Sequence, residues 1–165
     1  SSVLYESPVV FAWAFIVGGI VMLVVERMVR TPVVLAADQT PIPRAFAIGL
    51  FQTLALIPGV SRSGATIVGG LLMGLDRATA AVLSFFLAMP TMVAAFVYKL
   101  WEVRDHLAPE RAGEIAVGFV FAFLAALIVV KPFLRFVARS GFVPFAWYRI
   151  VAGVLILAAV RGGWL

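Results

Sequence analysis

Long uncharged stretches, separated by short segments that carry the charges, organise this chain. Four of the stretches approach the length of a membrane-crossing helix: residues 7–25, 78–98, 115–130 and 140–160. Such a helix needs about 20 mostly apolar residues, because charged groups are costly inside hydrocarbon. The third stretch is short but can be extended at either end, and the fourth is interrupted only by Arg149. The pattern therefore predicts about four crossing helices.

The segment 45–75 is also apolar, but it is broken in the middle. Within it, 17 uncharged residues precede Arg62 and 13 follow, and the break contains Pro58 and Gly59. Thirteen helical residues reach only about 20 Å, whereas the hydrocarbon core is about 30 Å thick. We therefore expect a re-entrant hairpin that enters the membrane, turns at the break and leaves as a short helix beginning at about Gly64. Irregular backbone at membrane depth is tolerated only where it is buried in protein or lines a water-filled cavity. Transporters and intramembrane enzymes place their sites there, so the turn is a candidate site.

Composition supports a membrane protein. Of the 165 residues, 64% are hydrophobic and 13% are charged, whereas a soluble domain carries about a quarter charged residues. These values exclude an ordinary soluble domain and a disordered chain. We expect residues 1–165 to form a single all-α transmembrane domain, embedded in membrane lipid and crossing the membrane several times.

The distribution of charge and the scarcity of cysteine and histidine exclude further classes of function. The net charge is +5, but the basic residues lie between apolar runs, which favours anchoring of loops over nucleic-acid binding. The chain has no cysteine, and its single histidine, His106, lies in a polar loop. Neither a thiolate site nor a histidine cluster for zinc is therefore expected.

A polar run occupies the predicted turn and the start of the second hairpin helix. A guanidinium at membrane depth is costly unless it is paired, and its planar fork of donors suits phosphate oxygens. Hydroxyls add donors, glycines let backbone N–H groups approach a ligand, and a helix N-terminus favours negative charge. These features predict an anion cradle, most simply for phosphate. Its members are Gly59, Ser61, Arg62, Ser63, Gly64 and Thr66.

A structural interpretation of the same residues stays open. Hydroxyls cap helix ends, Pro58 and Gly59 make a turn, and Arg62 pairs with a distant carboxylate or extends to the interface. No Asp or Glu lies within residues 45–75, so a general base or metal ligand near the turn has to come from another segment or chain. For Arg149 we expect a structural role.

Several motifs together resemble one known family. They are RAFAIG at 44–49, QTLALIPGVSRSGAT at 52–66, LSFFLAMP at 83–90, a run from 116 to 131, and FVPFAWYR at 142–149. They resemble the bacitracin-resistance family of undecaprenyl-diphosphate phosphatases over nearly the whole chain. The resemblance implies a bacterial inner-membrane hydrolase that converts undecaprenyl diphosphate to undecaprenyl phosphate, recycles this carrier for cell-wall synthesis and confers bacitracin resistance.

The resemblance also implies roles for individual residues. Arg62 is expected to clamp the diphosphate, while Ser61 and Thr66 bind phosphate oxygens or orient a nucleophile that is itself not identified. The family leads us to expect a divalent cation, Mg²⁺ or Ca²⁺, whose ligands are not identifiable in this chain. The remaining members are expected to shape the substrate cradle: Gly59, Ser63 and Gly64.

The chain also departs from the family, which has two related halves arranged as an inverted repeat. Only the second half is recognisable here, and the acidic signature of the first half has no counterpart. The chain alone is therefore expected to be inactive, or else to act as a homodimer. A third expectation is that it acts together with its missing N-terminal half. Two alternatives stay open: a polyprenyl-phosphate binding or transport protein without hydrolase activity, and an inactive fragment that needs its N-terminal half.

Overall fold

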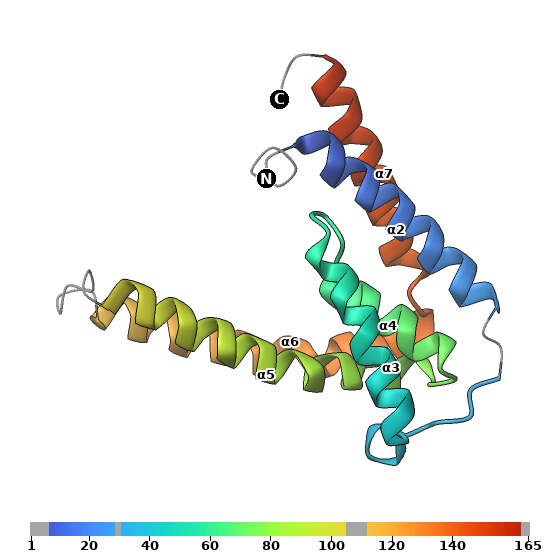
Figure 1. Ribbon diagram of the computed structural model, residues 1–165, viewed down its shortest axis with the longest axis horizontal. Coiled ribbons are helices and arrows are strands. Elements are labelled where there is room, and N and C mark those ends of the chain that lie inside the picture. Colours follow the sequence, from blue (N-terminus) through green and yellow to red (C-terminus); the bar gives the residue numbers. More distant parts are fainter. Residues whose placement is uncertain (1–6, 29–30, 105–111, 163–165) are drawn as a thin grey trace.

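The computed structural model describes residues 7–28, 31–104 and 112–162, and the long elements within these ranges are all helices (Figure 1). This confirms the predicted all-α class. The polar loop with His106 lies outside the described residues. In chain order the elements are α2 (Pro8–Met28), the short 3-10 helix η1 (Ala37–Gln39), α3 (Ile42–Gln52), the 3-10 helix η2 (Thr53–Leu56), α4 (Arg62–Leu72), α5 (Arg77–Val103), α6 (Ala112–Ser140) and α7 (Val143–Arg161).

In the described part of the chain, four helices are long and apolar enough to cross a membrane: α2, α5, α6 and α7. Each overlaps one of the predicted stretches. The largest difference is in α6, which continues ten residues beyond the predicted end at 130. Lys131, Arg135 and Arg139 recur every four residues, so they share one side of the helix, and their long side chains can extend toward water. Charge therefore did not end this helix.

Helices α2 and α7 lie side by side and run in opposite directions (Figure 1). Glycines set their close approach. A Cβ on Gly19 would lie 2.7 Å from the carbonyl oxygen of Ala146, and one on Gly153 would lie 2.7 Å from that of Ala12. Since small residues let helix backbones approach in a membrane, this pair has the packing typical of crossing helices.

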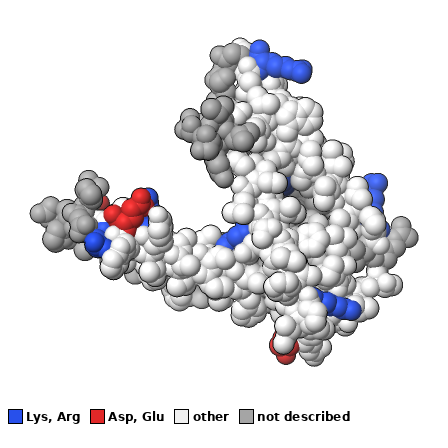
Figure 2. All heavy atoms as spheres, in the orientation of Figure 1, with Lys and Arg blue, Asp and Glu red and all other residues white. Residues whose placement is uncertain are grey.

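Helices α5 and α6 form a second pair that extends away from α2 and α7 (Figure 1). Aromatic rings join the base of this pair to α7. Phe133 packs edge-on against Phe85 and Phe145, with ring centroids 6.2 and 5.8 Å apart. Figure 2 shows that most of the molecular face in view belongs to uncharged residues, as expected for a surface in contact with lipid.

Between the two pairs, α3, η2 and α4 form a helical hairpin whose turn covers residues 57–61 (Figure 1). Its base is tied to the segment before α3, because Val34 N donates to Gly74 O over 3.1 Å and Asp76 N donates to Val34 O over 3.0 Å. Helix α4 packs against α2, α3 and α5, and all residues from Ala65 to Leu71 are buried. The predicted break thus produces two short antiparallel helices, while their depth in the membrane stays a prediction.

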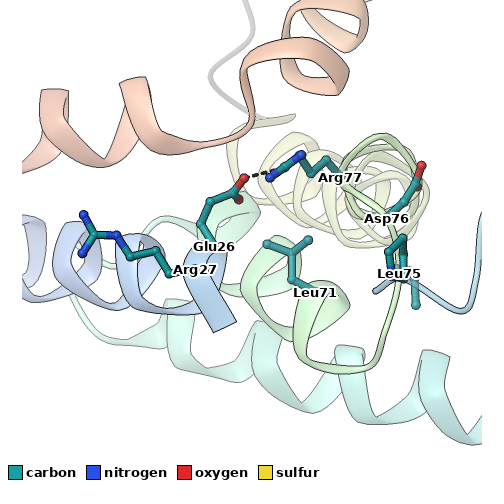
Figure 3. Close-up of a pocket in the computed structure, with 7 residues that line it drawn as sticks. Glu26, Arg27, Leu71, Leu75, Asp76 and Arg77 are labelled. Carbon is teal, nitrogen blue, oxygen red and sulfur yellow. Dashed lines mark hydrogen bonds and ion pairs between the residues drawn. The ribbon is translucent and has the colours of Figure 1, made fainter. Parts of the chain in front are cut away.

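At the base of the hairpin, an ion pair joins the end of α2 to the start of α5. Arg77 Nε donates to Glu26 Oε1, and the Glu26 side chain is only 5% exposed. Figure 3 shows these two side chains pointing toward each other, whereas Arg27 points away; all three residues line a cavity of about 360 Å³. The charged groups of this cavity do not converge on one point, so we interpret the ion pair as a structural contact.

Gly141, at the corner between α6 and α7, covers this ion pair. Its φ of +65° lies in the left-handed region, and its N–H donates to Val137 O over 2.9 Å, which ends α6. A Cβ at this position would collide with the carboxylate of Glu26. Glycine is therefore required here both by the backbone conformation and by the neighbouring ion pair.

We predict that Gly141→Ala lowers the free energy of unfolding by about 1–3 kcal/mol, because it combines backbone strain with a displaced ion pair. The measurement is the midpoint of detergent-induced unfolding of the purified protein. Gly118→Ala is the matched control, since a Cβ there meets nothing within 4 Å. Equal midpoints for the two variants would contradict the prediction.

Candidate functional site

The hairpin turn is a tight turn seated directly on α2. Val60 N donates to Ile57 O over 3.1 Å, with Pro58 second and Gly59 third in the turn. Gly59 has a φ of +84°, the conformation that a type II turn requires at this position. A Cβ on Gly59 would lie 2.8 Å from the Cβ of Ala14. The turn therefore reaches this position only because residue 59 has no side chain.

Ser61 begins α4 as its N-cap. Its Oγ accepts a hydrogen bond from Gly64 N over 3.1 Å and lies 3.2 Å from Ser63 Oγ. Helix α4 thus starts at Arg62, two residues before the predicted start at Gly64, because the serine replaces the missing helical partner of a first-turn N–H group. Ser61 and Gly64 line a cavity of about 600 Å³ between α2 and the hairpin, which is otherwise mainly apolar.

Arg62 points to a different cavity. Its NH1 donates to Thr91 Oγ1 in α5 over 3.0 Å, and both residues line a space of about 410 Å³ between the hairpin and α5. Gln52 lines the same space, and its Oε1 is buried without a hydrogen-bond partner within the described part of the chain. The two ion pairs formed between described residues do not include Arg62. The described structure therefore does not show the alternative pairing of Arg62 with a distant carboxylate.

Thr66 lies one turn further along α4, and it is only 1% exposed. Its Oγ1 is 2.7 Å from Ser84 Oγ in α5 and 3.1 Å from the carbonyl oxygens of both Arg62 and Ser63. In this conformation its hydroxyl joins α4 to α5. It therefore stabilises the first turn of α4 from the buried side.

The structure thus brings the predicted residues to one end of α4 but distributes them over three directions. Ser61, Ser63 and Gly64 form one group at the turn. Arg62 faces α5, and Thr66 faces the core between α4 and α5. An anion that contacts both the hydroxyl group and the guanidinium would have to lie across the N-terminus of α4.

Arg149 reaches the turn from α7, a contact that the sequence pattern did not predict. Its NH2 donates to Gly59 O over 3.0 Å and to Ala14 O over 3.2 Å. Its guanidinium lies over the ring of Phe15, 4.5 Å from the centroid. The available signal was a single charge inside an otherwise uncharged stretch, which indicates a buried partner but does not say where that partner lies. Gln52 carried no such signal.

The residues of this site do not by themselves fit a divalent cation. Magnesium and calcium prefer carboxylate and carbonyl oxygens, and the hairpin has no carboxylate. Throughout the described ranges, no group of three or more His, Cys, Asp or Glu side chains could hold a metal ion. A cation at this site would therefore need ligands from elsewhere.

Four apolar helices, with a polar hairpin turn between them, define a multi-pass α-helical membrane protein with a candidate anion site. Residues 1–155 match the family model described as "Bacitracin resistance protein BacA". The chain belongs to this family, which confirms the resemblance noted from the sequence.

Two curated relatives of this chain carry the same enzyme name. The undecaprenyl-diphosphatase of Paracoccus denitrificans is 52% identical over 162 residues, which are 98% of this chain and 61% of that protein. Undecaprenyl-diphosphatase 1 of Agrobacterium fabrum is 54% identical over 159 residues, 96% of this chain and 59% of the relative. The chain therefore spans about three fifths of the length of the curated relatives it matches.

We predict that Thr66→Val lowers the free energy of unfolding by about 1 kcal/mol, because the substitution leaves the buried Ser84 hydroxyl without its partner. Thermal unfolding in detergent measures the loss. Thr53→Val is the matched control, since the Thr53 hydroxyl bonds Leu50 O at an exposed position. A loss no larger than that of the control would show that the Thr66 hydroxyl does not stabilise the α4–α5 contact.

Proposed function

We propose that this chain is part of a bacterial inner-membrane enzyme that hydrolyses undecaprenyl diphosphate. The reaction consumes water and gives undecaprenyl phosphate and inorganic phosphate, which returns the lipid carrier to cell-wall synthesis and supports bacitracin resistance. One observation carries the proposal: the hairpin of a BacA-family chain presents Arg62, hydroxyls and a helix N-terminus at one turn.

In this proposal Arg62 is the cation that holds the diphosphate. Its hydrogen bond to the neutral Thr91 uses one of the five N–H donors of a guanidinium, which leaves donors for phosphate oxygens. Gln52 lines the same cavity, and an amide can present either its oxygen or its NH2 group. The walls of this cavity are therefore suited to an anion.

The N-terminus of α4 supplies the second part of the proposed site. Backbone N–H groups of the first turn and the hydroxyls of Ser61 and Ser63 would bind phosphate oxygens, while Gly59 and Gly64 shape the cradle. A direct contact of Thr66 with phosphate would require its hydroxyl to leave Ser84. In the described conformation Thr66 instead supports the turn that carries Arg62 and Ser63.

Cleavage of a phosphoanhydride depends mainly on stabilising charge as the leaving phosphate separates. Arg62 and the N-terminus of α4 provide fixed positive potential for this purpose. A general base and the ligands of the expected Mg²⁺ or Ca²⁺ would come from residues outside the hairpin, in a counterpart of the part of the relatives that this chain does not cover, or in a second copy of the chain. The nucleophile is not assigned.

A second candidate function is lipid-phosphate binding or transport without hydrolysis. It is favoured by one observation, the absence of any carboxylate from residues 45–75. A binder needs Arg62 and the hydroxyls but neither a base nor a nucleophile. The two functions therefore share the cradle and differ in phosphate release.

We predict that Arg62→Ala reduces phosphate release from undecaprenyl diphosphate by about 100-fold or more, as expected for the loss of a donor that stabilises transition-state charge. The assay uses the purified chain in detergent, alone and co-expressed with the part of a relative that it does not cover. Mg²⁺ and Ca²⁺ are each added and omitted. Arg139→Ala, at an exposed position at the end of α6, is the matched control and is expected to keep full activity.

Activity of Arg62→Ala within about twofold of the unaltered chain would contradict the proposed role of Arg62. Binding of the lipid without phosphate release in either preparation would favour the binder or transporter. Release only after co-expression would show that the co-expressed segment supplies part of the catalytic machinery.

A further inference from the structure

We propose that Arg149 is a positioning residue that clamps the hairpin turn onto α2 and thereby directs Ser61 and Arg62 toward the substrate. The clamp itself is a structural statement, whereas its effect on catalysis rests on the proposed function. Helix α7, which carries Arg149, contributes no other member of the candidate site.

In the clamp, one guanidinium nitrogen of Arg149, in α7, binds both α2 and the turn. Arg149 NH2 donates to Ala14 O in the middle of α2 and to Gly59 O in the turn, over 3.2 and 3.0 Å. The three residues lie on three different elements and come together only in the folded molecule. A single guanidinium therefore fixes the turn relative to both α2 and α7.

Two glycines make this arrangement sterically possible. A Cβ on Gly18 would lie 3.0 Å from Arg149 NH2, so a larger residue would crowd the guanidinium away from α2. A Cβ on Gly59 would lie 2.9 Å from Phe11 Cα, so a larger residue would lift the turn off α2. The Arg149 guanidinium thus fits against α2 because Gly18 has no side chain, and the turn fits against α2 because Gly59 has none.

The electrostatic environment of Arg149 also indicates a positioning role. Its hydrogen bonds go to backbone carbonyls, and its guanidinium stacks on Phe15. Arg149 takes part in neither of the ion pairs formed between described residues. A charged side chain inside an apolar helix usually has a functional role. Here the charged group binds a backbone carbonyl of the turn.

The turn is close enough to the candidate site for this clamp to matter. Gly59 precedes the N-cap Ser61 by two residues and Arg62 by three. Movement of the Gly59 carbonyl would therefore rotate the start of α4 and its first-turn N–H groups. Arg149, Ser61 and Gly64 also line the same cavity, so they occupy one side of the turn.

The test measures the position of the turn without relying on catalysis. The chain has no cysteine, so pairs of spin labels can be attached to introduced cysteines in the full 165-residue chain in lipid nanodiscs. One pair joins Ile57 in the turn to Val154 in α7, and a control pair joins Ile20 in α2 to Val154; all three side chains are about half exposed. Pulsed electron paramagnetic resonance gives the distance distribution of each pair.

We predict that Arg149→Met broadens or shifts the distribution from the turn to α7 and leaves the α2–α7 distribution unchanged. Arg149→Lys is expected to restore it in part, because lysine keeps one cationic donor group without the planar fork. Arg139→Met is the matched control and leaves both distributions unchanged. An unchanged turn distribution in Arg149→Met would overturn the proposal, as would a change in both pairs for Arg149→Met and Arg149→Lys alike.

The same variants separate this proposal from the proposed function. In a preparation that hydrolyses undecaprenyl diphosphate, Arg149→Met is expected to lower kcat at least 10-fold while KM changes less than threefold. A larger effect on KM than on kcat would indicate direct substrate binding and would overturn the positioning role. If no preparation releases phosphate from undecaprenyl diphosphate while the turn distribution still broadens in Arg149→Met, the proposed function fails and the clamp stands.

Discussion

A break between two helices leaves backbone N–H and C=O groups without helical partners, and the turn at residues 57–61 has to supply partners for them from within the protein. The turn satisfies one pair itself, through Val60 N and Ile57 O. Ser61 satisfies an N–H group of α4, and Arg149 satisfies the carbonyl of Gly59. The polar residues that make this turn a candidate site are thus partly the residues that allow it to exist at all.

The same polar residues both stabilise the turn and belong to the candidate site, which explains how the fold holds the start of α4 in place. Helix α4 is buried from Ala65 to Leu71, so its N-terminal end is held by packing on one side and by the turn on the other. Thr66 connects the first turn of α4 to Ser84 in α5. The start of α4 is consequently fixed by side chains that need not touch a substrate, while Arg62 and the serines remain available at its tip.

The sequence predicted the helices well because apolar length is a local property. The four long stretches and the hairpin were visible without tertiary information, and Pro58 with Gly59 marked the break. The sequence allowed residues 115–130 to be extended but did not predict how far, since charge on one face does not stop a helix whose other faces remain apolar. The direction of Arg149 depends on a close approach at Gly18, and that of Arg62 on its bond to Thr91; both partners are distant in the chain, and no local pattern contains that information.

The length of α6 has a consequence for the membrane around it. Its 29 residues correspond to about 43 Å of helix, well beyond the roughly 30 Å of a hydrocarbon core. The α5–α6 pair is also inclined to the α2–α7 pair (Figure 1), so the two pairs cannot both stand upright in a flat bilayer. The length beyond that core is accommodated by tilt or by placing the basic end of α6, with Lys131, Arg135 and Arg139, among the lipid headgroups. We therefore expect bilayer thickness to affect the angle between the two pairs, and with it the surroundings of the hairpin that lies between them.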